Sequence, residues 1–269
     1  MKAVRKHTEE KWVLLYIERW LKVPYQTSKS EVIERTMGVP QGSVIGPVLA
    51  NLFLHYVFDE WMSRNYPTIP FERYADDTIC HCVSEKQARF LKAVLKKRFG
   101  ECGLKLNEEK TKIVYCKDSN RRGDSEHTSF DFLGFTFRPR GARNRKTGQN
   151  FTAFLPAISK KSMKRIKEAV RAWKLNHKTF ACLLDISNEV DTQISGWMNY
   201  YMKFGRSEFR KVLKYINEWL TRWVMRKYKR FSKGKKFSKA YDWLVEYAAH
   251  NRNEFSHWVK GFVPYPRLG

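Results

Sequence analysis

Two adjacent aspartates, Asp76 and Asp77, stand at a tight turn between two short segments of β-strand character. Tyr74 and Ala75 precede them, and residues 78–83, Thr-Ile-Cys-His-Cys-Val, follow as the second strand. Carboxylates at contact distance repel each other, and a divalent cation removes that cost. The pair therefore predicts a β-hairpin whose tip holds a metal ion, with an ordinary acidic turn as the alternative.

Two further segments flank this hairpin. Residues 38–43 read Gly-Val-Pro-Gln-Gly-Ser, and residues 103–111 read Gly-Leu-Lys-Leu-Asn-Glu-Glu-Lys-Thr. The glycines around Pro40 and Gln41 give a backbone that a nucleic-acid strand can approach closely. The alternative for this segment is a loop that begins a helix at Ser43.

In this order, the three segments resemble the palm of a reverse transcriptase, most closely the kind carried by group II introns. The resemblance implies that Asp76 and Asp77 are catalytic and bind metal, Asp76 as the direct ligand and Asp77 as a peripheral one. In a complete site, two Mg²⁺ ions roughly 4 Å apart activate the attacking 3′-hydroxyl and stabilise the leaving pyrophosphate. The resemblance also implies template, primer or nucleotide contacts for Pro40, Gln41, Gly42, Tyr74, Ala75, Lys110, Leu133 and Gly134.

Two of these assignments have plain structural alternatives. Lys110 approaches the incoming triphosphate if the resemblance holds, or is a surface lysine before a strand. Phe132-Leu133-Gly134-Phe135 resembles the primer-grip hairpin, or is a hydrophobic hairpin that packs under a thumb domain.

The resemblance implies a further catalytic aspartate, on an apolar strand ahead of the helix predicted at residues 8–22. We expect that strand and the fingers to lie upstream of residue 1, in a separate N-terminal polypeptide or lost from this sequence. The carboxylates before Tyr74 stand in helical, loop or pre-turn settings and do not substitute for it: Glu9, Glu10, Glu18, Glu31, Glu34, Asp59, Glu60 and Glu72.

Positive charge is concentrated in the second half of the chain. Residues 1–134 contain 22 Lys and Arg and 18 Asp and Glu, a net charge of +4, which leaves +21 of the total +25 for residues 135–269. Basic charge with interleaved aromatic residues favours nucleic acid as the partner. An anionic membrane surface is the rival, but no amphipathic helix with a clear lipid-facing stripe is evident, so we expect no membrane partner.

Residues 194–201, Ile-Ser-Gly-Trp-Met-Asn-Tyr-Tyr, resemble the thumb or maturase domain of group II intron proteins. We interpret the aromatic residues of this segment as core. The surrounding cations are the better candidates for RNA phosphate contacts, above all Arg206, Arg210, Lys214, Arg222 and Arg226.

Neither the cysteines nor the hydropathy pattern indicates secretion. The five cysteines include no C-x-x-C pair, so a disulfide framework and a zinc site are not predicted. No apolar run reaches membrane-spanning length, and the N-terminus has no signal-peptide core. We expect an intracellular protein, in the cytoplasm or on the nucleoid if the source is bacterial.

The periodicities predict an α+β protein. Residues 1–151 are expected to form the C-terminal part of a palm, with helices over 8–22, 43–62 and 85–99 on a small antiparallel sheet that includes 112–116, and a hairpin at about 130–137. Residues 138–150 are expected to form a basic loop. Residues 152–269 are expected to form a mainly helical thumb or maturase domain.

Two functions from different classes follow. The first is an RNA-directed DNA polymerase of the group II intron type, incomplete as this single chain, with intron and template RNA, a DNA primer or target and dNTPs as partners. The alternative is a non-catalytic RNA-binding maturase remnant that assists intron splicing. A decayed reading frame with no selected role is a third reading.

Overall fold

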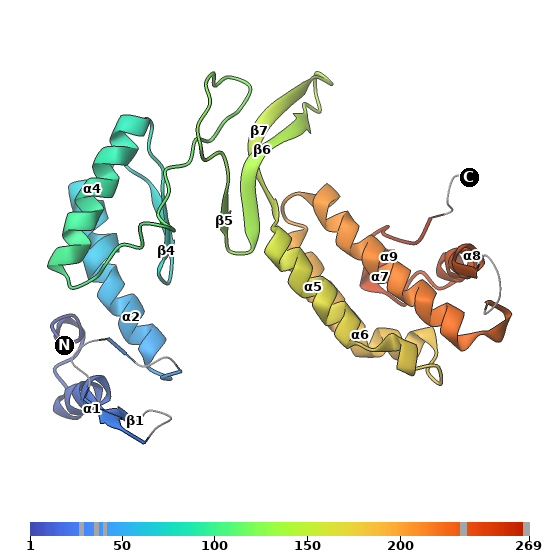
Figure 1. Cartoon of the computed structure of the whole chain (residues 1–269), viewed down its shortest axis with the longest axis horizontal. Coiled ribbons are helices and arrows are strands. Elements are labelled where there is room, and N and C mark those ends of the chain that lie inside the picture. Colours follow the sequence, from blue (N-terminus) through green and yellow to red (C-terminus); the bar gives the residue numbers. More distant parts are fainter. Residues whose placement is uncertain (27–29, 35–37, 40–41, 232–235, 266–269) are drawn as a thin grey trace. The chain divides into compact units, whose positions relative to one another are not determined.

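The computed structural model describes residues 1–269 except 27–29, 35–37, 40–41, 232–235 and 266–269. The described residues form two compact units, Met1–Ile113 and Val114–Gly269. Both combine helices with small antiparallel sheets, which confirms the predicted α+β class (Figure 1). The predicted domain boundary between residues 151 and 152 stays a prediction.

The first unit opens with a 3₁₀ turn and an amphipathic helix and continues through two hairpins and three more helices. Its elements are the 3₁₀ turn Val4–Lys6, α1 (Lys11–Lys22), β1 (Tyr25–Gln26), β2 (Val32–Ile33), α2 (Gly46–Leu54), a π-helical turn (His55–Asp59), α3 (Glu60–Asn65), β3 (Phe71–Tyr74), β4 (Asp77–Cys80) and α4 (Glu85–Glu101). Pro47 lies in the first turn of α2, where its missing N–H costs nothing. The side chain of Ser84 caps α4 by accepting a hydrogen bond from the backbone N–H of Gln87.

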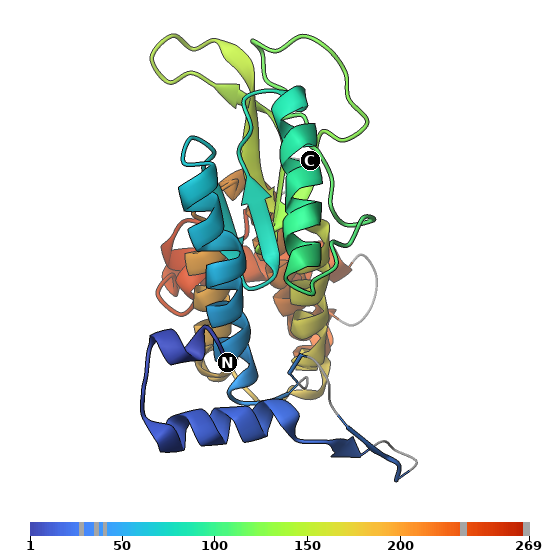
Figure 2. The same cartoon turned by 90° about the vertical axis from the view of Figure 1, so that its left-hand side faces the viewer.

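One face of the β3–β4 hairpin is covered by helices. Phe58 and Met62 from the continuous run of α2, the π-turn and α3 pack with Leu91 of α4 in a buried cluster that Phe71 and Cys80 join. In Figure 2 the helical run and α4 lie side by side over the hairpin. The hairpin thus has a buried face, while its turn, residues 75–76, stays exposed.

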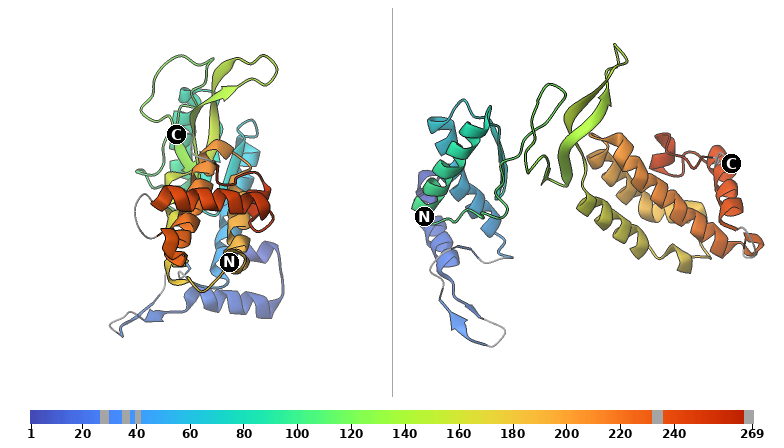
Figure 3. Two further views of the ribbon diagram at one scale, coloured as in Figure 1. Left: turned by 90° about the vertical axis from the view of Figure 1, so that its right-hand side faces the viewer. Right: turned by 45° about the horizontal axis from the view of Figure 1, so that its top comes forward.

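The second unit consists of a three-stranded sheet followed by a helical bundle. Its elements are β5 (Phe130–Phe132), β6 (Phe135–Arg143), β7 (Asn150–Ile158), α5 (Lys160–Ala172), the 3₁₀ turn Leu175–His177, α6 (Leu183–Tyr201), α7 (Arg206–Lys227), the 3₁₀ turn Lys229–Phe231, α8 (Lys236–His250) and α9 (Ser256–Val259). The sheet order is β5-β6-β7, antiparallel throughout, and β6 and β7 continue as a two-stranded hairpin beyond β5 (Figure 3).

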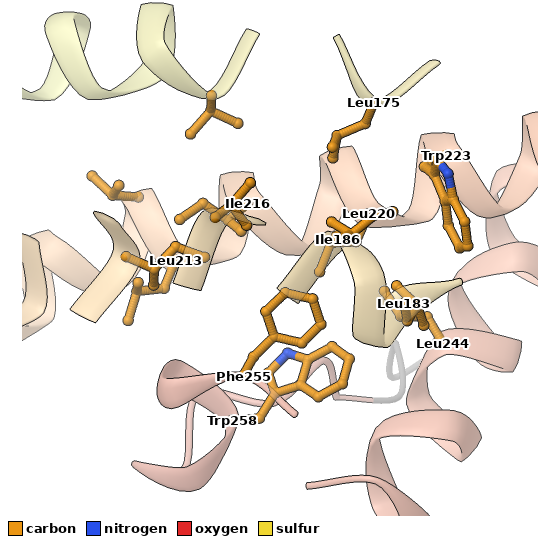
Figure 4. Packing of buried hydrophobic residues seen from close by; sticks show 14 of the residues in the cluster. Leu175, Leu183, Ile186, Leu213, Ile216, Leu220, Trp223, Leu244, Phe255 and Trp258 are labelled. Atoms are coloured by element: carbon orange, nitrogen blue, oxygen red, sulfur yellow. The ribbon is translucent and has the colours of Figure 1, made fainter. Parts of the chain in front are cut away.

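The bundle core is built from large aliphatic and aromatic side chains. Ile186, Leu213, Leu220, Trp223 and Trp258 are almost completely buried and point toward one another (Figure 4). The burial of this apolar area is the main source of the bundle's stability. The helices consequently turn their many lysines and arginines outward.

A polar group lies inside this core. Asn217, which is 3% exposed, accepts hydrogen bonds at Oδ1 from His257 Nε2 (2.8 Å) and from Trp258 Nε1 (3.0 Å), and donates from Nδ2 to the carbonyl of Phe262 (3.1 Å). The Nδ1 atom of His257 has no hydrogen-bond partner among the described residues. Burial lowers the pKa of His257 to about 3, so the ring is neutral in the folded protein.

This histidine predicts acid sensitivity. In the unfolded chain a histidine takes up a proton near pH 6.5, whereas folded His257 does not, so the unfolded state binds more protons between about pH 6.5 and 3. We expect the free energy of unfolding to decrease as the pH falls through this window. Urea unfolding from pH 7 to 4 measures the decrease, and NMR of the His257 ring should show neutral imidazole down to about pH 4.5. Ring signals of a protonated imidazole above pH 5 would contradict this prediction.

Two local predictions are wrong. Residues 112–116 form no strand, because their backbone makes one hydrogen bond to another segment of the described chain, from Tyr115 N–H to His127 O, instead of a ladder. Residues 138–150 are not a loop: β6 and β7 pair from Phe135 with Ile158 to Arg143 with Asn150, and only residues 144–149 form the turn. The segment was predicted as a loop because it is rich in basic residues. A strand forms there nevertheless, because the hydrogen bonds of a sheet come from the backbone and do not require an apolar pattern.

Candidate functional site

The turn between β3 and β4 presents both aspartates. Tyr74 pairs with Asp77 across the hairpin, so Ala75 and Asp76 form a two-residue turn. Ala75 has φ +53°, a left-handed conformation that costs a non-glycine residue on the order of 1 kcal/mol. Tyr74 is 63% exposed, and both aspartates are exposed. The predicted hairpin is therefore present, with its two carboxylates at the surface of the first unit.

Arg73 holds this turn from the buried side of the hairpin. Strand alternation places Arg73 on the same face as Phe71, toward the helices, and its side chain is only 11% exposed. Its Nε and Nη2 atoms donate to the two carboxylate oxygens of Asp59, each at 2.6 Å. Its Nη1 atom donates to Asn51 Oδ1 and to the carbonyl of Ala75, each at 2.9 Å. One side chain thus connects the helical run to the backbone of the turn.

The charge of Arg73 is neutralised by Asp59. Burial raises the pKa of the Asp59 carboxyl, but its hydrogen bonds and ion pair with Arg73, with a smaller contribution from His55, hold that pKa below its ordinary value. In the part of the chain that the structure describes, Asp76 and Asp77 form neither an ion pair nor a side-chain hydrogen bond. The two carboxylates are therefore available to a cation.

The chemistry of this donor pair fits Mg²⁺. Magnesium is usually bound by one or two carboxylates together with substrate phosphates and water, rather than by a full protein cage. Among the described residues, no group of three or more His, Cys, Asp or Glu side chains could hold a metal ion. Asp76 and Asp77 are thus a partial ligand set, of the kind that a substrate and a further carboxylate complete.

The glycine-rich loop is described only in part. Pro40 and Gln41, predicted to contact the template or nucleotide, lie outside the described residues. Gly42 is exposed with φ +86°, and open space surrounds the position that a Cβ would occupy. The hydroxyl of Ser43 accepts a hydrogen bond from the backbone N–H of Gly46, the first residue of α2, whose N-cap is Ile45; the helix therefore begins three residues after Ser43.

Lys110 lies on an exposed turn that is fastened to α4. Asn107 Oδ1 accepts a hydrogen bond from the backbone N–H of Lys110 (3.1 Å), and Glu108 forms ion pairs with Lys92 (3.5 Å) and Lys96 (2.8 Å). No hydrogen bond or ion pair among the described residues joins this turn to Asp76 or Asp77. The role of Lys110 in nucleotide binding stays a prediction.

Leu133 and Gly134 form the turn between β5 and β6, at φ +48° and +79°. The carbonyl of Leu133 accepts from Tyr200 Oη (2.8 Å), and that of Gly134 accepts from Ser162 Oγ (3.0 Å) and from the backbone N–H of Ser159 (2.9 Å). A Cβ at Gly134 would come within 2.9 Å of Ser162 Oγ. These contacts agree with the alternative of packing under the helices, and a role in primer binding stays a prediction.

The five predicted RNA-binding residues all lie on α7. The side chains of all five are exposed. They recur every fourth residue, except that Glu218 takes the place of a cation between the third and the fourth: Arg206, Arg210, Lys214, Arg222 and Arg226. In the described part of the chain, none of the five forms an ion pair with a carboxylate. The structure thus places all five on the exposed surface of α7, in a row called here the α7 stripe that winds round the helix by about 40° at each four-residue step. Its contact with RNA stays a prediction.

Comparison with known families identifies the class of the protein. A family model described as reverse transcriptase (RNA-dependent DNA polymerase) matches residues 1–137, and one described as group II intron, maturase-specific domain, matches residues 163–241. The chain belongs to the reverse transcriptases. Because the maturase-specific match follows on the same chain, it is a group II intron reverse transcriptase/maturase, as its motifs predicted.

A solved structure of telomerase from Candida albicans, in complex with a TWJ fragment of telomeric RNA, is similar over 93% of this chain and 39% of its own, with 16% sequence identity and a TM-score of 0.39. This chain therefore spans less than half the length of that telomerase chain. No curated protein matches the sequence. None of the described helices is long and apolar enough to cross a membrane.

Arg73 and Asn51 were not predicted from the sequence as site residues. Asp59 was considered only as a carboxylate that could not replace the further catalytic aspartate. A signal for Arg73 was present, because it follows Phe71 at a spacing of two, which puts both side chains on the same face of a strand. No comparable signal marks Asp59, since its partner is 14 residues away in the chain.

Proposed function

We propose that this chain is the palm and thumb portion of an RNA-directed DNA polymerase of the group II intron type. The observation that carries the proposal is the β3–β4 turn, where two exposed carboxylates that pair with no described cation stand side by side in a chain of the reverse transcriptase family. Asp76, with Asp77 beside it, would hold Mg²⁺. When bound, the metal supplies activation of the 3′-hydroxyl and stabilisation of the leaving pyrophosphate.

The site also needs a ligand that the described residues do not provide. We propose that a separate polypeptide carrying the fingers and the remaining palm aspartate completes it. Exposed aromatic side chains on one face of α1 support such a partner: Trp12 is 64% exposed, Tyr16 49% and Trp20 45%. A surface of this kind is usually covered by another protein segment.

RNA would bind to the second unit. Besides the α7 stripe, the sequence from residue 132 to residue 167 contains no acidic residue and ten cations, five on the β6–β7 hairpin and five on α5. Arg140 and Arg143 donate hydrogen bonds to carbonyls of their own hairpin, whereas Arg138, Arg145 and Lys146 are exposed. Such surfaces attract the phosphate backbone without reading its sequence.

Primer extension tests the proposal. A DNA primer on an RNA template, with Mg²⁺ and dNTPs, is incubated with this chain alone and with a polypeptide that supplies fingers and first palm strand of a group II intron reverse transcriptase. We expect extension only with the added polypeptide. Absence of extension in both reactions, with RNA binding intact, would contradict the polymerase function.

One observation favours a second candidate, a maturase that assists intron splicing without polymerising. The cationic surfaces lie on the second unit, whereas the carboxylates of the first unit are a partial ligand set. A self-splicing assay of group II intron RNA at low Mg²⁺ separates the two candidates. Faster splicing that is unaffected by Asp76→Ala, without any primer extension, would favour the maturase.

A further inference from the structure

We infer that Arg73, held by Asp59 and Asn51, is a positioning residue for the Asp76–Asp77 pair. It fixes the backbone of the turn and keeps its own positive charge away from the two carboxylates. This inference rests on the proposed metal-binding role of the pair and adds the residues that prepare it.

The backbone geometry of the turn supports this role of Arg73. A left-handed alanine in a two-residue turn is strained and persists when surrounding contacts determine its conformation. The contact that does so is the 2.9 Å hydrogen bond from Arg73 Nη1 to the carbonyl of Ala75, which belongs to the peptide group that joins Ala75 to Asp76. Because Arg73 belongs to β3 itself, the strand and the turn are fixed by the same side chain.

The charges around the turn also support this role of Arg73. A guanidinium three residues from a carboxylate pair would normally compete with a metal ion for those oxygens. Here the two parallel hydrogen bonds to Asp59 hold the guanidinium plane on the helical side of the hairpin, and the Asp59 carboxylate neutralises it. The Asp76 and Asp77 carboxylates, which pair with no described cation, therefore stay available to a metal.

The helical run that carries Asp59 has an irregular turn at this residue. Asp59 is the last residue of the π-helical turn His55–Asp59, where the backbone N–H of Glu60 bonds to the carbonyl of His55, five residues earlier. A π-turn inserts one residue into an α-helix and so rotates the side chains that follow it, and such turns are frequent at functional sites. Asn51, two turns earlier on the same helical run, reaches the same guanidinium.

Binding of Mn²⁺, followed by electron paramagnetic resonance on the full chain, tests the inference. Sites that disappear in Asp76→Asn define binding at the pair. We expect Arg73→Gln to weaken this binding about tenfold, as is usual when a residue that orients a metal ligand is lost. Arg73→Lys should not rescue it, because an ammonium group cannot make the four contacts of the guanidinium. Arg64→Gln is the matched control, since Arg64 is 74% exposed and, among the described residues, forms an ion pair only with Glu60 on its own helix.

A double-mutant cycle separates positioning from general stability. Asp59→Asn should also weaken Mn²⁺ binding, because it releases a charged guanidinium next to the pair, but it should have no further effect when Arg73 is already Gln. All measurements are made at a temperature where circular dichroism shows each variant to be folded. Variants that unfold at lower temperature yet bind Mn²⁺ as the parent chain does would overturn the inference and leave Arg73 a structural residue only.

Failure of the proposed metal site gives a different result. If the parent chain shows no Mn²⁺ binding that depends on Asp76, the metal-binding proposal fails and the positioning role falls with it. Amide hydrogen exchange of residues 75–77 then decides whether Arg73 still fixes the turn. Faster amide exchange in Arg73→Gln than in Arg64→Gln would show that Arg73 fixes the turn, and equal exchange in the two variants would show that it does not.

Discussion

Asp76→Ala is expected to abolish primer extension while leaving RNA affinity within about twofold of the parent chain. The first part follows from the loss of the carboxylate that would hold the metal, and removal of a group central to the chemistry typically lowers kcat by several orders of magnitude. The second part follows because Asp76 lies on the first unit, whereas the cationic surfaces lie on the second. Extension is measured in the presence of the added N-terminal polypeptide, and RNA affinity by filter binding.

Asp242→Ala is a matched control for this change. Asp242 is an exposed aspartate on α8, and its replacement raises the net charge by the same single unit. It should reduce neither extension nor RNA affinity. Residual extension by the Asp76→Ala variant at more than about one hundredth of the parent rate would show that another group carries the chemistry.

Replacement of the five α7 cations by glutamine is expected to have the largest effect on RNA binding. Each phosphate that a cation neutralises releases counterions and contributes roughly 0.7 to the slope of log affinity against log salt for single-stranded RNA. If all five contact phosphate, the slope should decrease by roughly 3.5, and affinity near physiological salt should fall by at least about a hundredfold. The variant is Arg206, Arg210, Lys214, Arg222 and Arg226 all changed to Gln.

The control removes the same charge from the first unit. It replaces four exposed arginines and one exposed lysine there by glutamine: Arg5, Arg19, Arg64, Arg89 and Lys97. Because this set has the same composition, any difference between the two variants reports position rather than net charge. Equal loss of affinity in both would mean that RNA responds to overall charge, and the α7 stripe would not be a binding surface.

Local sequence determined the hairpin and most helices of this protein. The Tyr74–Asp77 turn is bounded by strand-forming residues, and Ser84 and Ser159 cap α4 and α5, since each serine accepts a hydrogen bond from a backbone N–H three residues later. These features depend on neighbours in the chain, so they are readable from the sequence. The strands of residues 138–143 and 150–153 were not readable, because a ladder of backbone hydrogen bonds places no demand on side-chain polarity.

The family and the hairpin turn that carries Asp76 and Asp77 could be predicted from the sequence, because they are encoded in short motifs with a fixed order. The surroundings of the turn were decided by the tertiary structure. Arg73 meets Asp59 across 14 residues and Asn51 across 22, and only the packing of the helical run against the hairpin brings them together. The same packing decided which charge remains available, since Asp59 neutralises Arg73 while Asp76 and Asp77 stay exposed. The sequence thus identifies the two carboxylates, whereas the fold decides that no cation among the described residues pairs with them, because ion pairing depends on distance in space and not along the chain.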